Sequence, residues 1–209
     1  MITCNLIVYG KELIPIAAMP SSSDKLLLAA IDLMAEKGYH NTTTKEIAAA
    51  AGLNEVTLFR HFGNKLNLLK AAFERYHYAG VMTKLFEEKL VYELVPDLLL
   101  VSRTYHETML RNKKLIQISF KESDALPELH AFSRTHPEQL KKLLTEYFAA
   151  MAKKGKVLSD RPELLAVTFM WMNYGSFVSM LNNASSFPNI RLDDYIEESV
   201  RVFARGLTP

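Results

Sequence analysis

The stretch TTTKEIAAAAGLNEVTLFRHFGNK, Thr42 to Lys65, decides the fold. Within it, Thr43 is followed three residues later by Glu46, and this spacing is the capping box that starts a helix. Gly52 stands where that short helix must end, because glycine adopts the left-handed backbone that closes many helices. The stretch therefore opens with one short predicted helix and a turn.

A second short helix is predicted directly after the turn. Asn54 is a favoured capping residue, and the helix that it starts runs from Glu55 to Phe62. Ala48 and Ala51 are small enough for the two helices to cross closely. Two short helices joined by a turn of a few residues have the layout of a helix-turn-helix, although an ordinary helical hairpin has the same outline.

The segments on both sides of this stretch also predict helices. A serine run precedes apolar residues at helical spacing, and Gly38 ends that segment. Further on, Pro137 and Pro162 each follow a capping residue, so both are expected in the first turn of a helix. Leu6–Tyr9 is the only strand-like run. We therefore predict an all-α protein, with one continuous helix from Asn67 toward Lys84 among its elements.

Composition narrows the class of protein further. The chain has 209 residues, of which 49% are hydrophobic and 23% charged, which is typical of a soluble globular protein. Its single cysteine, Cys4, excludes an internal disulfide and a cysteine-based metal site, so we expect a cytoplasmic protein. No uninterrupted apolar run approaches membrane-spanning length, and a membrane partner is not expected.

The first twenty residues differ from the rest. No positive charge precedes their apolar part, so they do not resemble a signal peptide, and we expect residues 1–20 to form a loosely held tail. A second hypothesis is that translation starts at Met19, directly before the first predicted helix.

The second helix of a helix-turn-helix enters the major groove of DNA. Here that helix carries polar, charged and large apolar residues that face outward, and lysines flank the motif at Lys45 and Lys65. The outward residues are Glu55, Val56, Thr57, Phe59, Arg60 and His61. The pattern favours contacts with phosphates and with base edges.

The residues from Leu26 to Ala72 closely resemble the DNA-binding domain of the tetracycline-repressor (TetR) family of transcriptional regulators. The matched positions are Thr43, Ile47, Ala48, Ala51, Gly52, Leu53, Thr57, Leu58, Phe59, His61, Phe62, Lys65, Leu68 and Leu69. The resemblance implies a homodimer of subunits with about nine helices. Residues 21–68 would form a three-helix DNA-binding domain for a palindromic, double-stranded operator, and residues 69–209 would bind an effector and dimerise.

The resemblance also implies roles for single residues. Thr44, Thr57, His61 and Lys65 correspond to phosphate contacts, and Lys45 and Arg60 correspond to contacts with or near bases. Asn54, Glu55, Val56 and Phe59 complete the predicted DNA-binding set. Val56 and Phe59 depart from the family pattern, which leaves a second hypothesis: a family-like protein that binds small molecules and has weakened or lost operator binding.

The C-terminal part is rich in aromatic residues and methionine, and these fit either an ordinary core or a cavity for an apolar or aromatic effector. The predicted ligand-binding residues are Phe86, Tyr105, Met109, Phe120, Phe148, Met170 and Tyr174. The apolar segment 163–181, with Gly175 on its small-residue strip, and the helix 192–207 are the predicted dimer helices. Glu197 and Arg201 are expected to pair on the second of them.

An enzymatic function is not favoured. The six histidines include no pair at helical i,i+4 spacing, and there is no glycine-rich phosphate loop and no nucleophile elbow. We therefore expect neither a metal site nor a cofactor.

Overall fold

The computed structural model describes residues 6–9, 12–15, 20–76, 78–122, 126–181 and 189–208. The chain forms two compact units, Met1–Ala72 and Phe73–Pro209. The sequence placed this boundary at residue 68; the structure places it a little further along the same helix. The remaining residues, which include Met19 and most of the predicted tail, lie outside the description.

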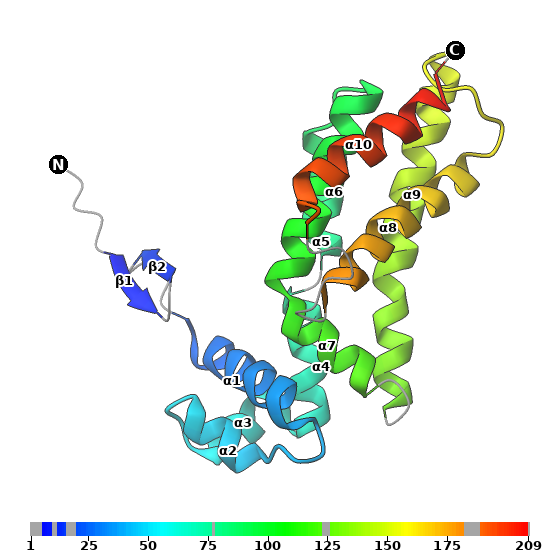
Figure 1. Cartoon of the computed structure of the whole chain (residues 1–209). Helices are drawn as coiled ribbons and strands as arrows, with labels where there is room; N and C mark the ends of the chain where they lie inside the picture. Colours follow the sequence, from blue (N-terminus) through cyan, green and yellow to red (C-terminus); the bar gives the residue numbers. More distant parts are fainter. Residues whose placement is uncertain are drawn as a thin grey trace. The chain divides into compact units, whose positions relative to one another are not determined.

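Within the described residues the chain forms ten helices and two short strands (Figure 1). The elements are β1 Leu6–Tyr9, β2 Glu12–Pro15, α1 Ser22–Lys37, α2 Thr44–Ala50, α3 Glu55–Phe62, α4 Lys65–Tyr76, α5 Ala79–Glu88, α6 Leu94–Arg111, α7 Lys113–Lys121, α8 Pro127–Lys153, α9 Pro162–Leu181 and α10 Leu192–Arg205. Both units are helical as predicted, and the two strands precede the first helix in the sequence.

The two strands form an antiparallel pair that the sequence indicated only in part. Leu6 lies opposite Pro15, and Tyr9 lies opposite Glu12. Pro15 counted against a second strand, because proline cannot donate a backbone hydrogen bond. It occupies the last position of an edge strand, where proline is tolerated.

The first unit is built on local capping signals. The Ser21 hydroxyl accepts a hydrogen bond from the backbone N–H of Asp24, and Gly38 ends α1 with a positive φ of 85°. Apolar residues of α1 to α4 then form one core. Its buried members are Leu26, Leu27, Ala30, Ile31, Met34, Ile47, Ala48, Leu58, Leu68, Leu69 and Ala72.

The second unit packs α5, α6, α8, α9 and α10 around a larger core. A buried carboxylate joins two of these helices: the Asp97 side chain on α6 accepts hydrogen bonds from the Tyr147 hydroxyl on α8 and from the backbone N–H of Val91, both at 3.0 Å. At the surface, Arg103 on α6 bonds to Asp193 and Glu197 on α10 at 2.8 and 2.7 Å. These contacts hold α6 against its neighbours.

Three expectations about this unit are wrong. Pro137 lies inside the long helix α8 instead of starting it. Glu197 bonds to Arg103, and Arg201 pairs with Glu198 at 3.0 Å instead. The expected continuous helix after Asn67 is interrupted, because α4 ends at Tyr76 and α5 begins at Ala79. Glu197 bonds to a residue 94 positions earlier in the sequence, and neither proline nor glycine stands between Tyr76 and Ala79 to mark the break.

Because of His106 on α6, we expect the free energy of unfolding to depend on pH. The imidazole is 1% exposed, and burial lowers its pKa from 6.5 to about 4. The unfolded chain therefore binds more protons between these values, so the free energy of unfolding falls as the pH drops below about 6.5. We expect a loss of about 2 kcal/mol between pH 7 and pH 5. Urea unfolding at several pH values measures it.

The matched variant is His106→Gln, which removes the titrating group. It should be less stable at pH 7 but should lose much less stability than the unmodified protein toward pH 5. An equal slope in the His106→Gln protein would contradict the assignment.

Candidate functional site

Helix α2 is fixed at its first turn by the predicted capping box. The Thr43 hydroxyl accepts from the backbone N–H of Glu46 at 3.2 Å, and the Glu46 carboxylate accepts from the backbone N–H of Thr43 at 2.9 Å. Lys37 at the end of α1 lies 3.0 Å from the same carboxylate. The Thr43 backbone bond and then Lys37 lower the pKa of Glu46 to about 2, so this carboxylate stays ionised at neutral pH.

Helix α3 follows a tight turn and begins at its predicted cap. Gly52 has a φ of 67°, the left-handed conformation for which glycine was expected there. The Asn54 side-chain oxygen accepts from the backbone N–H of Thr57 at 2.9 Å and from its hydroxyl at 2.8 Å. The buried Leu58 anchors α3 in the core of the first unit.

The outer side of α3 is exposed. Its two large apolar side chains, Val56 and Phe59, are 75% and 48% exposed. Arg60 and His61 are exposed as well, and so is Lys45 on α2. Val56, Phe59 and Arg60 share one side of the helix by their spacing. We call Lys45, Val56, Phe59, Arg60 and His61 the reading surface.

Two predicted phosphate contacts have their hydroxyl groups engaged within the motif. The Thr44 hydroxyl donates to the Glu55 carboxylate at 2.6 Å, and the Thr57 hydroxyl donates to Asn54. The first bond joins the start of α2 to the start of α3, so Glu55 connects the two helices. In this arrangement neither threonine hydroxyl is available as a donor to a phosphate.

Lys65, another predicted phosphate contact, is built into the first unit. Its ammonium group donates to the backbone carbonyls of Tyr39 and Thr42 at 2.8 and 2.7 Å. It also lies 4.2 Å from the centre of the Tyr39 ring, within the range of a cation–π contact. The side chain thus joins the start of α4 to the segment between α1 and α2.

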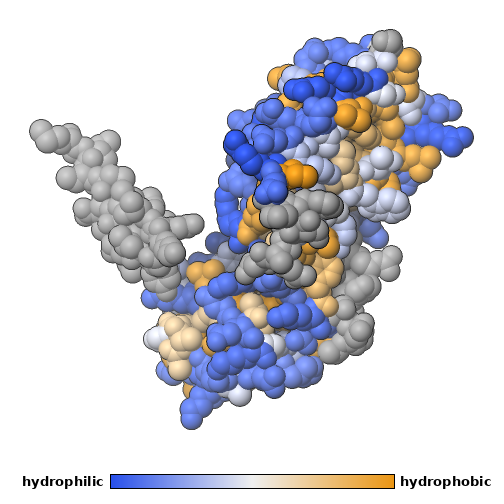
Figure 2. Space-filling view, viewed as in Figure 1, coloured by the Kyte–Doolittle hydropathy of each residue, from blue (hydrophilic) through white to orange (hydrophobic). Residues whose placement is uncertain are grey.

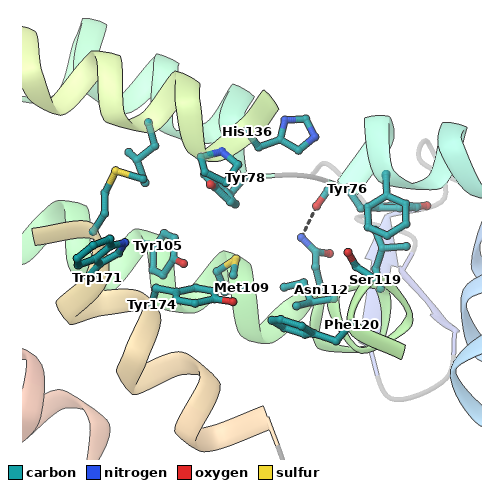
Figure 3. A pocket seen from close by; sticks show the side chains of 16 residues that line it. Tyr76, Tyr78, Tyr105, Met109, Asn112, Ser119, Phe120, His136, Trp171 and Tyr174 are labelled. Carbon is teal, nitrogen blue, oxygen red and sulfur yellow. Dashed lines mark hydrogen bonds between the residues drawn. The ribbon is translucent and has the colours of Figure 1, made fainter. Parts of the chain in front are cut away.

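The second unit contains a cavity of about 510 Å³ (Figure 3). Its lining residues are Phe73, Tyr76, Tyr78, Tyr105, Met109, Asn112, Leu115, Ile116, Ser119, Phe120, His136, Pro137, Leu140, Met170, Trp171 and Tyr174. They come from α4, α6, α7, α8 and α9, from the segment before α5 and, for Asn112, from the junction of α6 and α7. The volume lies within the range of pockets that bind small molecules.

Five of the seven predicted ligand-binding residues line this cavity, namely Tyr105, Met109, Phe120, Met170 and Tyr174. Phe86 and Phe148 lie outside it. Phe148 is fully buried in the core against the rings of Phe169 and Phe203, and Phe86 packs edge-on to Tyr147. Core residues and cavity residues recur at the same helical spacing, so the sequence pattern could not distinguish them.

Helix α9 carries an exposed apolar stripe made of Leu164, Trp171, Tyr174 and Val178. In the single chain, the buried side of this helix carries Ala166, Phe169, Asn173 and Phe177. Among the described residues, α9 is the one helix long and apolar enough to cross a membrane by length and composition. Figure 2 shows hydrophobic patches on the surface of this unit among hydrophilic residues.

Comparison with known proteins matches both units. Residues 26–72 match the model of the bacterial regulatory proteins of the tetR family, and residues 96–206 match the model of the C-terminal domain of AefR-like transcriptional repressors. An uncharacterized HTH-type transcriptional regulator, YvkB of Bacillus subtilis (strain 168), is 30% identical over 190 residues, which cover 91% of this chain and 99% of YvkB.

Solved structures share the fold. NalD of Pseudomonas aeruginosa, the secondary repressor of the MexAB-OprM multidrug efflux pump, superposes with a TM-score of 0.67 at 20% identity, over 90% of this chain and 95% of NalD. The ketosteroid transcriptional regulator KstR2 of Mycobacterium tuberculosis gives a TM-score of 0.66 at 16% identity, over 92% of this chain and 97% of KstR2.

Proposed function

Because this chain belongs to the tetR family of bacterial regulatory proteins, we propose that it is a repressor that binds a palindromic DNA operator as a homodimer and leaves it when a small-molecule effector binds. Membership makes it a DNA-binding transcriptional regulator and not an enzyme. The observation that supports operator binding most directly is the reading surface, which is exposed on a helix that Asn54 caps and the buried Leu58 anchors. Such a regulator acts on chromosomal DNA, so its place is the cytoplasm.

Within the reading surface, Arg60 and Lys45 are the proposed base contacts. A guanidinium group can bond two acceptors of one guanine, and an exposed apolar side chain such as Val56 or Phe59 can pack against a thymine methyl group. His61 is the proposed phosphate contact. Thr44, Thr57, Glu55 and Asn54 support the motif through their mutual hydrogen bonds, and Lys65 does so through Tyr39 and Thr42.

Selection of genomic DNA fragments with the purified full-length protein tests this function and yields the operator. We then expect Arg60→Ala to cost about 1–3 kcal/mol at one operator position and to relax specificity there, because a base contact is lost. The matched control is Arg111→Ala, whose guanidinium pairs with Glu107 on the surface of the second unit. A uniform loss of affinity over all sequences would show that Arg60 contacts phosphate instead.

A second function is favoured by the exposed Val56 and Phe59. Phe59 has no hydroxyl to bond a phosphate, and the bulk of Val56 restricts approach to the groove. On this alternative the protein binds its small molecule but reads no operator. The same selection separates the two, because the alternative predicts no enriched fragment.

The proposed effector site is the cavity of the second unit. An effector releases DNA only if it binds the DNA-incompetent form more tightly, and effector and operator then weaken each other by the same factor. Phe73 and Tyr76 in the wall belong to α4. The first residue of this helix, Lys65, donates hydrogen bonds within the first unit. Asn112 bonds to the Tyr76 carbonyl at the end of this helix. A shift of α4 is the proposed connection between ligand and DNA.

A further inference from the structure

The described wall of the cavity carries no formal charge from lysine, arginine, aspartate or glutamate. Its one titratable imidazole, His136, stands edge-on to the Tyr78 ring, with 6.3 Å between the ring centres. Moving a carboxylate, a phosphate or an ammonium group from water into such a site is strongly unfavourable without an opposite charge to pair with it. Apart from the His136 imidazole, the wall therefore offers no charge to pair with that of a ligand, and this favours an uncharged one.

Aromatic rings form much of this wall. Tyr78 and Tyr105 meet edge to face, with ring centres 5.4 Å apart. Figure 3 shows Trp171, Tyr105 and Tyr174 on one side of the cavity and Tyr78 and His136 across from them. The rings that line the cavity offer apolar surfaces, and these suit a ligand that is itself aromatic.

Several residues of the wall carry polar atoms that have no partner in the described part of the chain. The ring of Tyr105 is buried, with 6% of the residue exposed, yet within the described residues its hydroxyl makes no hydrogen bond, and the same holds for Tyr78 and Tyr174. Burial raises the pKa of all three phenols, so they remain neutral donors. Asn112 donates to the Tyr76 carbonyl, and its side-chain oxygen accepts no bond from the described part of the chain.

These residues line the cavity, so an occupant can bond to their polar atoms without displacing a protein partner. We infer that the ligand is an uncharged aromatic molecule that carries a hydroxyl or carbonyl group. This inference rests on the proposed function only in treating the cavity as the effector site. The neutral phenols of the wall can donate to its oxygen, the Asn112 oxygen can accept from its hydroxyl, and the rings can cover its aromatic faces.

Three probes that share one scaffold test the charge of the ligand: biphenyl-4-ol, biphenyl-4-carboxylate and N,N,N-trimethylbiphenyl-4-aminium. Binding to the full-length protein is measured by titration calorimetry and by the emission of Trp171, the only tryptophan and a residue of the wall. We expect biphenyl-4-ol to bind about 100-fold more tightly than the carboxylate and about 10-fold more tightly than the cation, which the rings partly stabilise. Equal or tighter binding of either ion, or no binding of biphenyl-4-ol, would overturn the inference.

Single tyrosine-to-phenylalanine variants test the polar contacts. Tyr105→Phe keeps the ring and removes a hydroxyl that has no described partner, so the fold should not change, and biphenyl-4-ol should bind about tenfold more weakly. Tyr92→Phe, outside the cavity, is the control and should bind as before. If Tyr78→Phe, Tyr105→Phe and Tyr174→Phe all bind biphenyl-4-ol like the unmodified protein, the hydrogen-bonding part of the inference is wrong.

The ligand class and the repressor function can fail separately. Probe binding is measured without DNA, and operator selection is measured without probe. A protein that selects an operator but does not bind biphenyl-4-ol keeps its proposed function and loses the ligand class. A protein that binds biphenyl-4-ol but selects no DNA keeps the ligand class and loses the repressor function.

Discussion

Replacing Gly175 by leucine is expected to convert the proposed dimer into a monomer. Gly175 is exposed on α9 next to the apolar stripe, and a Cβ atom added there would meet nothing within 4 Å in its own chain. Leucine also favours helix more than glycine does, by nearly 1 kcal/mol. The single chain should therefore fold normally, while the bulky side chain forces two closely packed copies of α9 apart.

Loss of the dimer should also weaken operator binding by about 10²–10⁴-fold, because two linked half-site contacts become independent. Light scattering at micromolar concentration gives the mass, and circular dichroism checks the fold. Gly80→Leu is the control, since Gly80 is also exposed in a helix with nothing within 4 Å of an added Cβ. A monomeric mass for the unmodified protein, or a dimeric Gly175→Leu protein, would contradict the proposed interface.

The second large effect is expected for Lys65→Met. The substitution keeps an apolar stem but leaves the carbonyls of Tyr39 and Thr42 without their donor and removes the contact with the Tyr39 ring. We expect the first unit to lose about 2–4 kcal/mol of stability. Trp171 lies in the second unit and does not report on this loss, so hydrogen exchange of α2 and α3 is the appropriate measurement.

Lys45→Met provides the comparison, because Lys45 is exposed and its loss should affect DNA binding but not exchange. The resemblance to the family implied that Lys65 contacts phosphate. If Lys65→Met left exchange unchanged and lowered the salt dependence of operator binding by about one, that implied role would be correct and the structural role wrong.

The sequence predicted the first unit well because its helix ends are specified locally. Thr43 and Glu46 satisfy each other within one turn, and Asn54 caps α3 from the adjacent position. Gly52 adopts a positive φ, a backbone conformation that glycine favours more than other residues do. Signals of this kind depend on neighbours three or four residues away, so they can be recognised without knowledge of the rest of the fold.

The contacts that the sequence missed join distant segments. Lys65 reaches residues 26 and 23 positions earlier, and Arg103 reaches α10 about 90 positions later. Pro137 has the same local surroundings as Pro162, yet it lies inside α8, while Pro162 begins α9. The cavity forms where aromatic side chains from several helices leave space between them. The periodicity of one helix does not show which of its aromatic residues border such a space.

The position of Trp171 restricts how this protein can evolve new ligand preferences. The residue belongs both to the cavity wall and to the exposed stripe of α9, where 72% of it is uncovered in the single chain. On the proposed dimer, any substitution there alters ligand choice and self-association together, so selection for one trait acts on the other. Ser119 and Phe120 on α7 also line the cavity but lie outside the stripe. Diversification, in nature or in the construction of a biosensor, should therefore proceed through α7.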